Sequence, residues 1–257
     1  MENEMTEDRL EGKNPILEAL KAGRTIHKLW IQKPGDDRGR QDPIIAKVIY
    51  LSKQTGAAVV EVDKRVLDQM SQTHGHQGII AQVAMHDYYD VDEIIGIAKE
   101  KGEEPFLMIL DELKEAFNLG SILRVADACG AHGIIIPKHR SVGLDASVAK
   151  SSAGAMEHVP VAKVVNLTQT INDLKEKGFW IIGAESEGAM SYDKVDYKGS
   201  IAIVIGSEGE GIGRLVKENC DFLVSIPMRG KVNSLNVAVA AGIIAFEAAK
   251  QRNGAAG

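Results

Sequence analysis

The segment 226–247 constrains the fold of this chain more than any other. It begins IPMRGKVNSLN, an apolar strand ending that meets a glycine turn and then the polar residues Ser234 and Asn236. Serine and asparagine favour helix N-termini because their side-chain oxygens accept the unpaired backbone N–H groups of the first turn. The residues that follow are small and helix-forming, which lets another backbone approach closely. Taken alone, the segment could equally be an ordinary strand–turn–helix with a packing role or part of a functional site.

Two further segments share this organisation and narrow the choice. Residues 117–130 read FNLGSILRVADACG and follow the apolar run 106–110, which ends at Asp111. Residues 201–213 read IAIVIGSEGEGIG, a buried-strand pattern that opens into a glycine loop. Glycines at strand ends admit positive φ and leave backbone groups facing a ligand. All three segments therefore lie at predicted carboxyl ends of strands, where open α/β sheets place their binding sites.

In order and spacing, these segments resemble the three motifs of the SpoU family of RNA ribose 2'-O-methyltransferases, within the SPOUT superfamily. The first motif pairs an asparagine with an arginine six residues later, as Asn118 and Arg124 do. The second is an apolar strand leading to Gly-x-Glu-Gly, which residues 206–209 match. The third is Ile-Pro-Met followed by Ser-Leu-Asn, which 226–228 and 234–236 match. One departure is that residues 114–117 replace the family's usual Asp-Pro pair.

The resemblance implies a cofactor and a fold that spacing does not reveal. The cofactor is S-adenosylmethionine, bound without a metal in the loops of a deep C-terminal trefoil knot. Backbone groups at Gly206, Ile226 and Leu235 are expected to hold its adenine and ribose. Three neighbours complete the predicted cofactor site: Met228, Gly183 and Ala184.

Arg124 is the expected catalytic residue, with two roles open. Its planar fork suits a phosphate beside the target ribose. It could instead accept the hydroxyl proton, although a free guanidinium is a poor base. We expect Asn118 to cap its helix and to orient the arginine or the RNA, and Glu208 to hold a loop N–H or the arginine. Ser234 and Asn236 are expected to cap the last helix and to orient the substrate or the arginine.

The N-terminal part carries its own resemblance. Residues 10–85 are similar to the substrate-binding domain of the family's ribosomal-RNA members, including the stretches 12–20 and 76–83. A separate small domain resembles the bacterial 23S ribosomal-RNA guanosine enzymes, which favours 23S rRNA over tRNA as the substrate. The family also implies a homodimer in which the arginine acts across the interface.

Composition places the chain among soluble cytoplasmic proteins. No apolar run in its 257 residues approaches the roughly 20 needed to cross a bilayer, and the first residues are acidic. The two cysteines, Cys129 and Cys220, have no zinc or disulfide spacing, and Cys129 is predicted to be a small core residue. The net charge of −6 disfavours a nucleic-acid partner weakly, because phosphates attract cations. Basic residues are nevertheless locally dense, at Lys13, Lys21, Arg24, Lys28, Lys33, Arg38, Arg40, Lys47 and Lys53, and again at Lys138, His139 and Arg140.

Alternating patterns predict two α/β domains. Residues 1–9 are expected to be a flexible tail, 10–87 the small RNA-binding domain, 88–104 a linker with a short helix, and 105–252 the methyltransferase domain. In the last of these, near-continuous apolar strands separated by helices predict a parallel sheet covered on both faces. Periodicity alone predicts a Rossmann-like domain without a knot, since threaded chains are rare.

Three other function classes have sequence signatures that can be compared with this chain. Residues 209–213 are glycine-rich but do not fit the dinucleotide fingerprint, because position 214 is arginine. A P-loop fails because Lys231 is followed by valine. A catalytically silent RNA-binding protein remains an alternative, although such a protein would be expected to have lost Arg124, Glu208 or Asn236. Lone histidines such as His132, His139 and His158 are expected to be structural or exposed.

Overall fold

The computed structural model describes residues 8–33, 42–185, 190–231 and 234–253. The chain divides into two compact units. The smaller unit comprises Met1–Asp87 and Gly143–His158, and the larger comprises Tyr88–Val142 and Val159–Gly257. Each unit is described by itself below.

The smaller unit is built on a four-stranded mixed sheet with the order β1-β4-β2-β3. Its strands are β1 (Asp8–Glu11), β2 (Ile26–Gln32), β3 (Ala58–Val62) and β4 (Ile79–Val83). Its first three helices are α1 (Lys13–Lys21), α2 (Pro43–Gln54) and α3 (Lys64–Met70). Apolar side chains Ile26, Leu29 and Ile31 of β2 are buried, and α1 packs on α2. The predicted small α/β domain is therefore present.

The chain's first described residues are ordered in strand β1. Asp8 and Arg9, which the sequence placed in a flexible tail, pair antiparallel with Val83 and Gln82 of β4. Residues 1–7 of the predicted tail lie outside the described residues. A single short strand flanked by charged residues gives little periodic signal, which explains why β1 was missed.

A segment far along the chain also belongs to the smaller unit. It contains helix α6 (Ala146–Ser151) and the short 3-10 helix η1 (Ala155–Glu157). The sequence had assigned both to the methyltransferase domain. The buried guanidinium of Arg24 ion-pairs with Asp8 at 3.1 Å and with Glu157 at 2.8 Å. The Lys150 ammonium donates to the carbonyl of Thr73 at 3.0 Å. These contacts between distant residues hold the segment in place, and no local pattern announces them.

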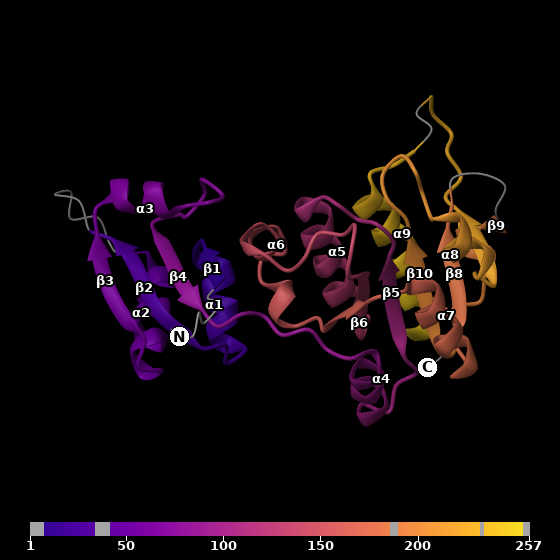
Figure 1. Cartoon of the computed structure of the whole chain (residues 1–257), viewed down its shortest axis with the longest axis horizontal. Coiled ribbons are helices and arrows are strands. Elements are labelled where there is room, and N and C mark those ends of the chain that lie inside the picture. Colours follow the sequence, from indigo (N-terminus) through magenta and orange to yellow (C-terminus); the bar gives the residue numbers. More distant parts are fainter. Residues whose placement is uncertain (1–7, 34–41, 186–189, 232–233, 254–257) are drawn as a thin grey trace. The chain divides into compact units, whose positions relative to one another are not determined.

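The larger unit contains a seven-stranded sheet with the order β7-β6-β5-β10-β8-β11-β9 (Figure 1). All of its strand pairs are parallel. The strands are β5 (Phe106–Leu110), β6 (Gly133–Pro137), β7 (Val161–Val164), β8 (Trp180–Ala184), β9 (Met190–Ser191), β10 (Ile201–Ile205) and β11 (Phe222–Ser225). The predicted parallel α/β sheet is confirmed, with β9 as an addition that the sequence did not reveal.

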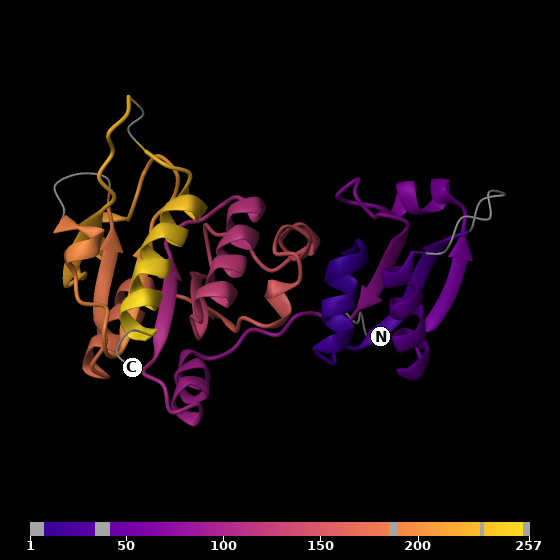
Figure 2. The ribbon, with the colours of Figure 1, turned by 180° about the vertical axis from the view of Figure 1, so that it is seen from behind.

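Helices cover both faces of this sheet. They are α4 (Val91–Glu100), α5 (Ala116–Cys129), α7 (Leu167–Glu176), α8 (Arg214–Glu218) and α9 (Val237–Asn253). Helices α5 and α9 pack together on one face, where Figure 2 shows them side by side. On the other face, side chains of α4, α7 and α8 join the core formed by the sheet residues Leu107, Ile135 and Ala202. The strand interiors are apolar because both faces are covered.

The sequence predicted a linker for residues 88–104, but helix α4 in this stretch is packed into the larger unit. Ile94 and Ala98 are fully buried, and Ile94 belongs to the core of the larger unit. The helix itself was expected, and its capping box of Asp90 and Glu93 explains its sharp start. This part of the chain is therefore packed structure within the larger unit. Over the described ranges, no helix is long and apolar enough to cross a membrane.

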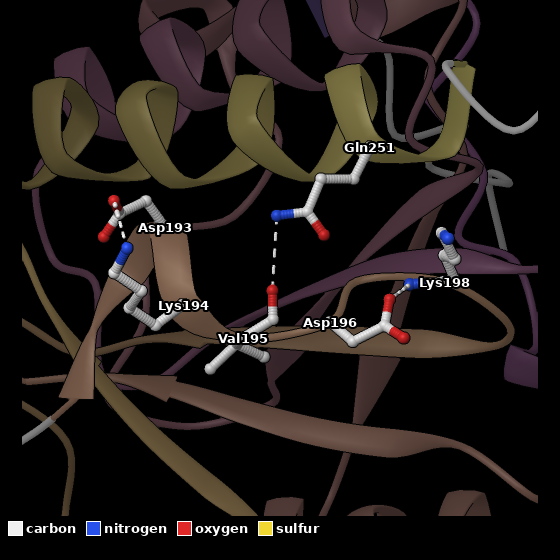
Figure 3. Close-up of a pocket in the computed structure, with 6 residues that line it drawn as sticks. All are labelled: Asp193, Lys194, Val195, Asp196, Lys198 and Gln251. Atoms are coloured by element: carbon white, nitrogen blue, oxygen red, sulfur yellow. Dashed lines mark hydrogen bonds and ion pairs between the residues drawn. The ribbon is translucent and has the colours of Figure 1, made fainter.

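The C-terminal end of α9 is anchored by a reciprocal amide contact. Gln251 donates from Nε2 to the carbonyl of Val195 at 3.2 Å and accepts the Tyr197 N–H on Oε1 at 3.2 Å. Figure 3 shows Gln251 above this segment, beside a polar hollow that Asp193 and Lys198 also line. Burial of the Tyr197 ring raises the pKa of its phenol above the ordinary value. Anchored here, α9 presents its opposite end to the carboxyl edge of the sheet.

Candidate active site

The motif loops meet around a cavity at the carboxyl edge of the larger sheet. Its volume is about 280 Å³. Residues from the ends of β8, β10 and β11, from the two following loops and from the first turns of α9 form its walls: Ala184, Glu185, Ile205, Gly206, Ser207, Glu208, Gly209, Gly211, Val224, Ile226, Met228, Ser234, Leu235, Val237, Ala240 and Ile244. The walls combine apolar side chains with backbone at glycines, as small-molecule sites do.

The loop after β10 is closed so tightly that Gly206 admits no side chain. A Cβ atom at Gly206 would lie 2.0 Å from the carbonyl carbon of Gly211 and 2.3 Å from the Ile212 nitrogen. Ser207 and Gly211 exchange both backbone hydrogen bonds, each at 3.0 Å. Gly209 and Gly211 have φ of 88° and 69°, which glycine adopts without steric cost. The loop thus turns its backbone toward the cavity, as the second motif implied.

A buried carboxylate supports this loop from the neighbouring strand. Asp111, at the end of β5, is 6 % exposed and accepts the Gly213 N–H on Oδ2 at 2.8 Å. Burial raises the pKa of the Asp111 carboxyl, and the Gly213 N–H partly opposes this by favouring the charged form. Sequence reasoning had not given Asp111 a role. The end of β5, which leads to the first motif, is therefore joined to the loop of the second motif.

The raised pKa of Asp111 has a consequence for stability. An acid with a raised folded-state pKa contributes stability that is fully present below its unfolded-state pKa and is lost as pH rises through the folded-state pKa. We expect Asp111→Asn, which keeps an oxygen for the Gly213 N–H, to gain stability over the wild type as pH rises from 4 to 8. Urea denaturation across this range measures it, and a constant difference between the two proteins contradicts the assignment.

Asn236 connects all three motifs. Its Nδ2 donates to Asn118 Oδ1 at 3.0 Å and to Glu208 Oε1 at 2.8 Å. Its Oδ1 accepts the backbone N–H groups of Ala238 and Val239, at 3.0 and 3.4 Å, and so caps α9. The side-chain amide uses both donor hydrogens and both acceptor positions. An amide is therefore required here, since serine or aspartate cannot provide the same set.

Two substitutions separate the roles of Asn236. Asn236→Ala removes the cap as well as the contacts with Asn118 and Glu208, and we expect it to lower the unfolding free energy by about 1 kcal/mol. Asn236→Asp keeps the capping oxygen but places a carboxylate against Glu208. Both variants are expected to weaken binding of S-adenosylmethionine, the predicted cofactor, in calorimetry. Wild-type affinity in Asn236→Asp would show that the link to Glu208 is dispensable.

The structure brings most predicted site residues together. Ala184, Gly206, Ile226, Met228 and Leu235 from the predicted cofactor set line the cavity, as do Glu208 and Ser234 from the predicted catalytic set. Gly183 lies one residue before the cavity wall and allows close packing, because a Cβ there would meet Cys220 Sγ at 2.9 Å. Burial also raises the pKa of the Cys220 thiol to about 12, so this cysteine stays protonated at neutral pH.

The prediction that Asn118 caps its helix is wrong. Helix α5 begins at Ala116 with Glu115 before it, so Asn118 lies inside the first turn. Its side chain is 4 % exposed and accepts from Asn236. At this position an asparagine neither caps the helix nor favours helix formation. Its presence is explained by the tertiary hydrogen bond with Asn236. That partner lies 118 positions away in the sequence.

Arg124 stands apart from the cavity. It is exposed on α5 and is not among the cavity residues. Within the described ranges, its guanidinium has no hydrogen bond or ion pair. Six residues separate it from Asn118, so it lies about 9 Å further along the helix. A cation that forms no ion pair with a described residue is available to a phosphate.

Other titratable groups of the larger unit have structural explanations. The ring of buried His132 accepts the Phe106 N–H at 3.0 Å and contacts Glu103 at 3.1 Å, and burial lowers its pKa. The prediction that Cys129 is a core residue is confirmed, since it is 8 % exposed. No group of three or more potential metal ligands gathers in the part of the chain that the structure describes. The cavity and the Asn236 network are therefore the candidate site.

Two family models match this chain, one for each predicted domain. The model of the SpoU rRNA Methylase family matches residues 105–246. The chain belongs to this family. The model for RNA 2'-O ribose methyltransferase substrate binding matches residues 9–89. The prediction of a SpoU-family RNA methyltransferase that depends on S-adenosylmethionine is thus confirmed at the level of the family.

Relatives and solved structures agree with this placement. The chain is 48% identical over 246 residues to YacO of Bacillus subtilis, which is named among TrmH family tRNA/rRNA methyltransferases, with 96% of each chain covered. The SpoU methyltransferase AviRb from Streptomyces viridochromogenes, solved with the cofactor AdoMet, superposes with a TM-score of 0.79 at 25% identity, covering 96% of this chain and 91% of that one. An AdoMet-bound rRNA methyltransferase from Sinorhizobium meliloti gives 0.77 at 25% identity, covering 95% and 87%.

Proposed function

We propose that this SpoU methyltransferase transfers the methyl group of S-adenosylmethionine to the ribose 2'-hydroxyl of a guanosine in 23S rRNA, in the cytoplasm. The observation that carries the proposal is the Asn236 network, which joins Asn118 and Glu208 at the rim of a cavity formed by the motif loops. A silent RNA-binding protein would not need to keep Arg124, Glu208 and Asn236 together, and this chain keeps all three.

The residues of the cavity fit the cofactor. At Gly206 any Cβ would collide with the loop backbone, so the position is reserved for main chain facing the cavity. We propose that backbone groups of Gly206, Ile226 and Leu235 hold the adenine and ribose, with Met228 and Ala184 alongside. The bound cofactor supplies an electrophilic methyl group on a sulfonium. The chain's own task is then to align the ribose hydroxyl, receive its proton and exclude water.

For Arg124 we propose a positioning role on the RNA. Its fork pairs with the phosphate beside the target ribose and holds the 2'-hydroxyl toward the cavity. The alternative role is direct acceptance of the hydroxyl proton. It requires the guanidinium to be deprotonated first, although Arg124 is exposed to water in the single subunit, where a guanidinium stays protonated. Exposure without an ion pair among the described residues favours positioning.

We also propose a homodimer that brings Arg124 to the partner's cavity. Helices α5 and α9 expose Phe117 at 69 %, Val239 at 50 % and Phe246 at 50 %. Large apolar side chains gathered on two adjacent helices favour a protein partner. A second copy would cover them and place one subunit's Arg124 near the other's cofactor loops. The trefoil knot of the C-terminal loops, implied by the resemblance, stays a prediction. Light scattering that reports a monomer at micromolar concentration would contradict the dimer.

The choice of ribosomal RNA rests on the smaller unit. The substrate-binding model covers residues 9–89, and the rRNA methyltransferase from Sinorhizobium meliloti matches 95% of this chain. The TrmH/SpoU tRNA modifying enzyme of A. aeolicus matches 64% of it, with a TM-score of 0.54. A protein with a separate RNA-binding unit therefore fits a large structured RNA better than tRNA, which stays the alternative.

The deciding experiment maps ribose methylation across total RNA. A strain that lacks the protein is compared with the same strain complemented by the wild type or by Gly206→Ala. We expect one 2'-O-methylguanosine of 23S rRNA to disappear on deletion and to return with the wild type alone. Loss of a tRNA methyl group would establish the alternative, and unchanged methylation of all RNA would overturn the proposal.

A further inference from the structure

The basic residues of the smaller unit differ in whether a carboxylate already holds them. Of the described basic residues between Lys13 and Lys53, four form ion pairs with carboxylates at 2.5 to 3.5 Å. The pairs are Lys13 with Asp42, Lys21 with Glu18, Arg24 with Asp8 and Glu157, and Lys33 with Asp63. Lys28 lies over the ring of Trp30 at 5.0 Å. Arg38 and Arg40 lie outside the described residues. This leaves Lys47 and Lys53, both exposed on α2.

Lys47 and Lys53 flank an exposed aromatic ring. Tyr50 lies midway between them and is 62 % exposed. Positions three apart are neighbours on a helix surface, so the three side chains form one stripe, which winds about 120° around α2 and runs about 9 Å along its axis. We call these residues the α2 stripe. The opposite face of the helix is buried through Val48 and Ser52, so α2 is held in place by packing on its inner side alone.

No acidic side chain among the described residues pairs with the α2 stripe. Helix α2 contains no Asp or Glu between Pro43 and Gln54. The carboxylate of its capping residue, Asp42, is engaged by Lys13 and by two backbone N–H groups. Across the described residues, the side chains of Lys47, Tyr50 and Lys53 have no hydrogen bond or ion pair of their own. One exposed tyrosine would need no explanation, but a tyrosine between two free lysines does.

We propose that the α2 stripe is a contact surface for single-stranded RNA, with Tyr50 stacking on an unpaired base and the two lysines binding the phosphates on either side. The proposal rests on the proposed function, because it assigns part of that enzyme's RNA substrate to a surface. Every base offers a flat face to an aromatic ring, and lysines attract the backbone without reading sequence. A span of about 9 Å matches roughly two to three stacked nucleotides at 3.4 Å each.

The stripe therefore favours an unpaired segment, such as a loop, over a continuous duplex. In double-stranded RNA the bases are already stacked on one another, and a single ring on a convex helix face cannot reach between them. Stacking also explains why the residue between the lysines is aromatic, since a third lysine would serve a purely electrostatic contact better.

Binding of the intact protein to a fluorescein-labelled twelve-residue oligoriboadenylate, followed by anisotropy, tests this proposal. We expect Tyr50→Ala to weaken binding about 10-fold and Tyr50→Phe, which keeps the ring, to bind like the wild type. Lys47→Gln combined with Lys53→Gln should reduce the slope of log K against log salt by about 1.4, because each phosphate contact on a single strand contributes about 0.7.

A charge-matched control lies on another helix of the same unit. Lys64 and Arg65 of α3 are exposed, and their helix also carries Asp68 and follows Asp63. Lys64→Gln combined with Arg65→Gln removes the same charge and is expected to change the slope far less. Equal effects of the two pairs, wild-type binding by Tyr50→Ala, or no binding of the oligonucleotide by the wild type would each overturn the proposal.

Calorimetry with S-adenosylmethionine keeps this test separate from the proposed function. The α2 stripe variants are expected to bind the cofactor with the wild-type constant, since none of their residues lines the cavity. If the wild type binds the oligonucleotide but methylates no RNA, the proposed function fails while the α2 stripe stands. If methylation is mapped as expected but Tyr50→Ala binds RNA normally, the α2 stripe alone fails.

Discussion

Replacing Gly206 by alanine is expected to abolish cofactor binding while the larger unit stays folded. The added Cβ would lie 2.0 Å from the backbone of Gly211, which is too short for any contact and involves main chain that cannot rotate away. The Ser207–Gly211 hydrogen bonds must therefore open, and the loop must leave the cavity wall. We expect the dissociation constant for S-adenosylmethionine to rise at least about 100-fold, at a stability cost of about 1–3 kcal/mol. Calorimetry and thermal melting measure the two effects.

Gly96→Ala is the matched control for this substitution. A Cβ at Gly96, in α4, meets no atom within 4 Å, so the exchange should leave the cavity unchanged. Alanine in a helix interior is expected to stabilise the protein by about 1 kcal/mol. Unchanged cofactor affinity in Gly206→Ala would mean that the loop after β10 does not form the binding surface. Equal loss of affinity in both variants would mean that the assay reports general damage.

The sequence predicted the larger sheet well because its signal is local. Runs such as 106–110 and 201–205 are apolar throughout, and both became strands with the predicted bounds. A strand buried on both faces needs continuous apolar residues, so pattern and structure coincide. Strand β9 has two residues, and a strand so short carries no periodic signal.

The parts that sequence could not predict depend on distant partners. The sequence assigned residues 143–158 to the methyltransferase domain, but the ion pair between Arg24 and Glu157 ties them to the smaller unit. In the sequence Asp111 only marks the end of a strand. In the structure its carboxylate accepts the N–H of Gly213, 102 positions away. The spacing of helices and strands also cannot reveal whether the chain is threaded through a loop, so the knot is predicted from the family resemblance alone. Local chemistry predicts which residue types a site needs, and tertiary contacts decide what each one does.

The site prediction shows the same division. Glycines and apolar strand ends located the cavity, because only main chain and small residues fit a tight loop. The residue expected to carry catalysis, Arg124, is nevertheless exposed on α5 and absent from the cavity wall. Asn118 was assigned to its own helix end and instead meets Asn236. A single subunit thus forms the cavity proposed for the cofactor without its arginine, which is the arrangement expected if the arginine acts in the partner.

Arg124→Ala is expected to abolish methyl transfer without affecting cofactor binding. The side chain lies outside the cavity and has no intramolecular partner in the described ranges, so its removal leaves the Asn236 network intact. Loss of one positioned charged donor should reduce the transfer rate about 100-fold or more. Arg124→Lys keeps the charge but loses the bidentate fork, so it should recover only part of the rate. Single-turnover rates and calorimetry separate the two properties. Equal loss of transfer and of cofactor binding would indicate a folding defect instead.

Mixing the two inactive variants tests whether Arg124 acts across the dimer. A heterodimer of Arg124→Ala and Gly206→Ala subunits contains one cavity with an intact loop, and that cavity belongs to the subunit that lacks the arginine. If the arginine comes from the partner, this cavity is completed by the Gly206→Ala subunit, whose Arg124 is intact. Random pairing then restores about one quarter of all sites, because half of the dimers are mixed and each has one competent site. If the arginine acts within its own subunit, neither cavity is complete and co-expressed variants stay inactive. Activity near one quarter of wild type, from two proteins that are inactive alone, requires both the dimer and the shared site, and its absence in verified heterodimers refutes the shared site.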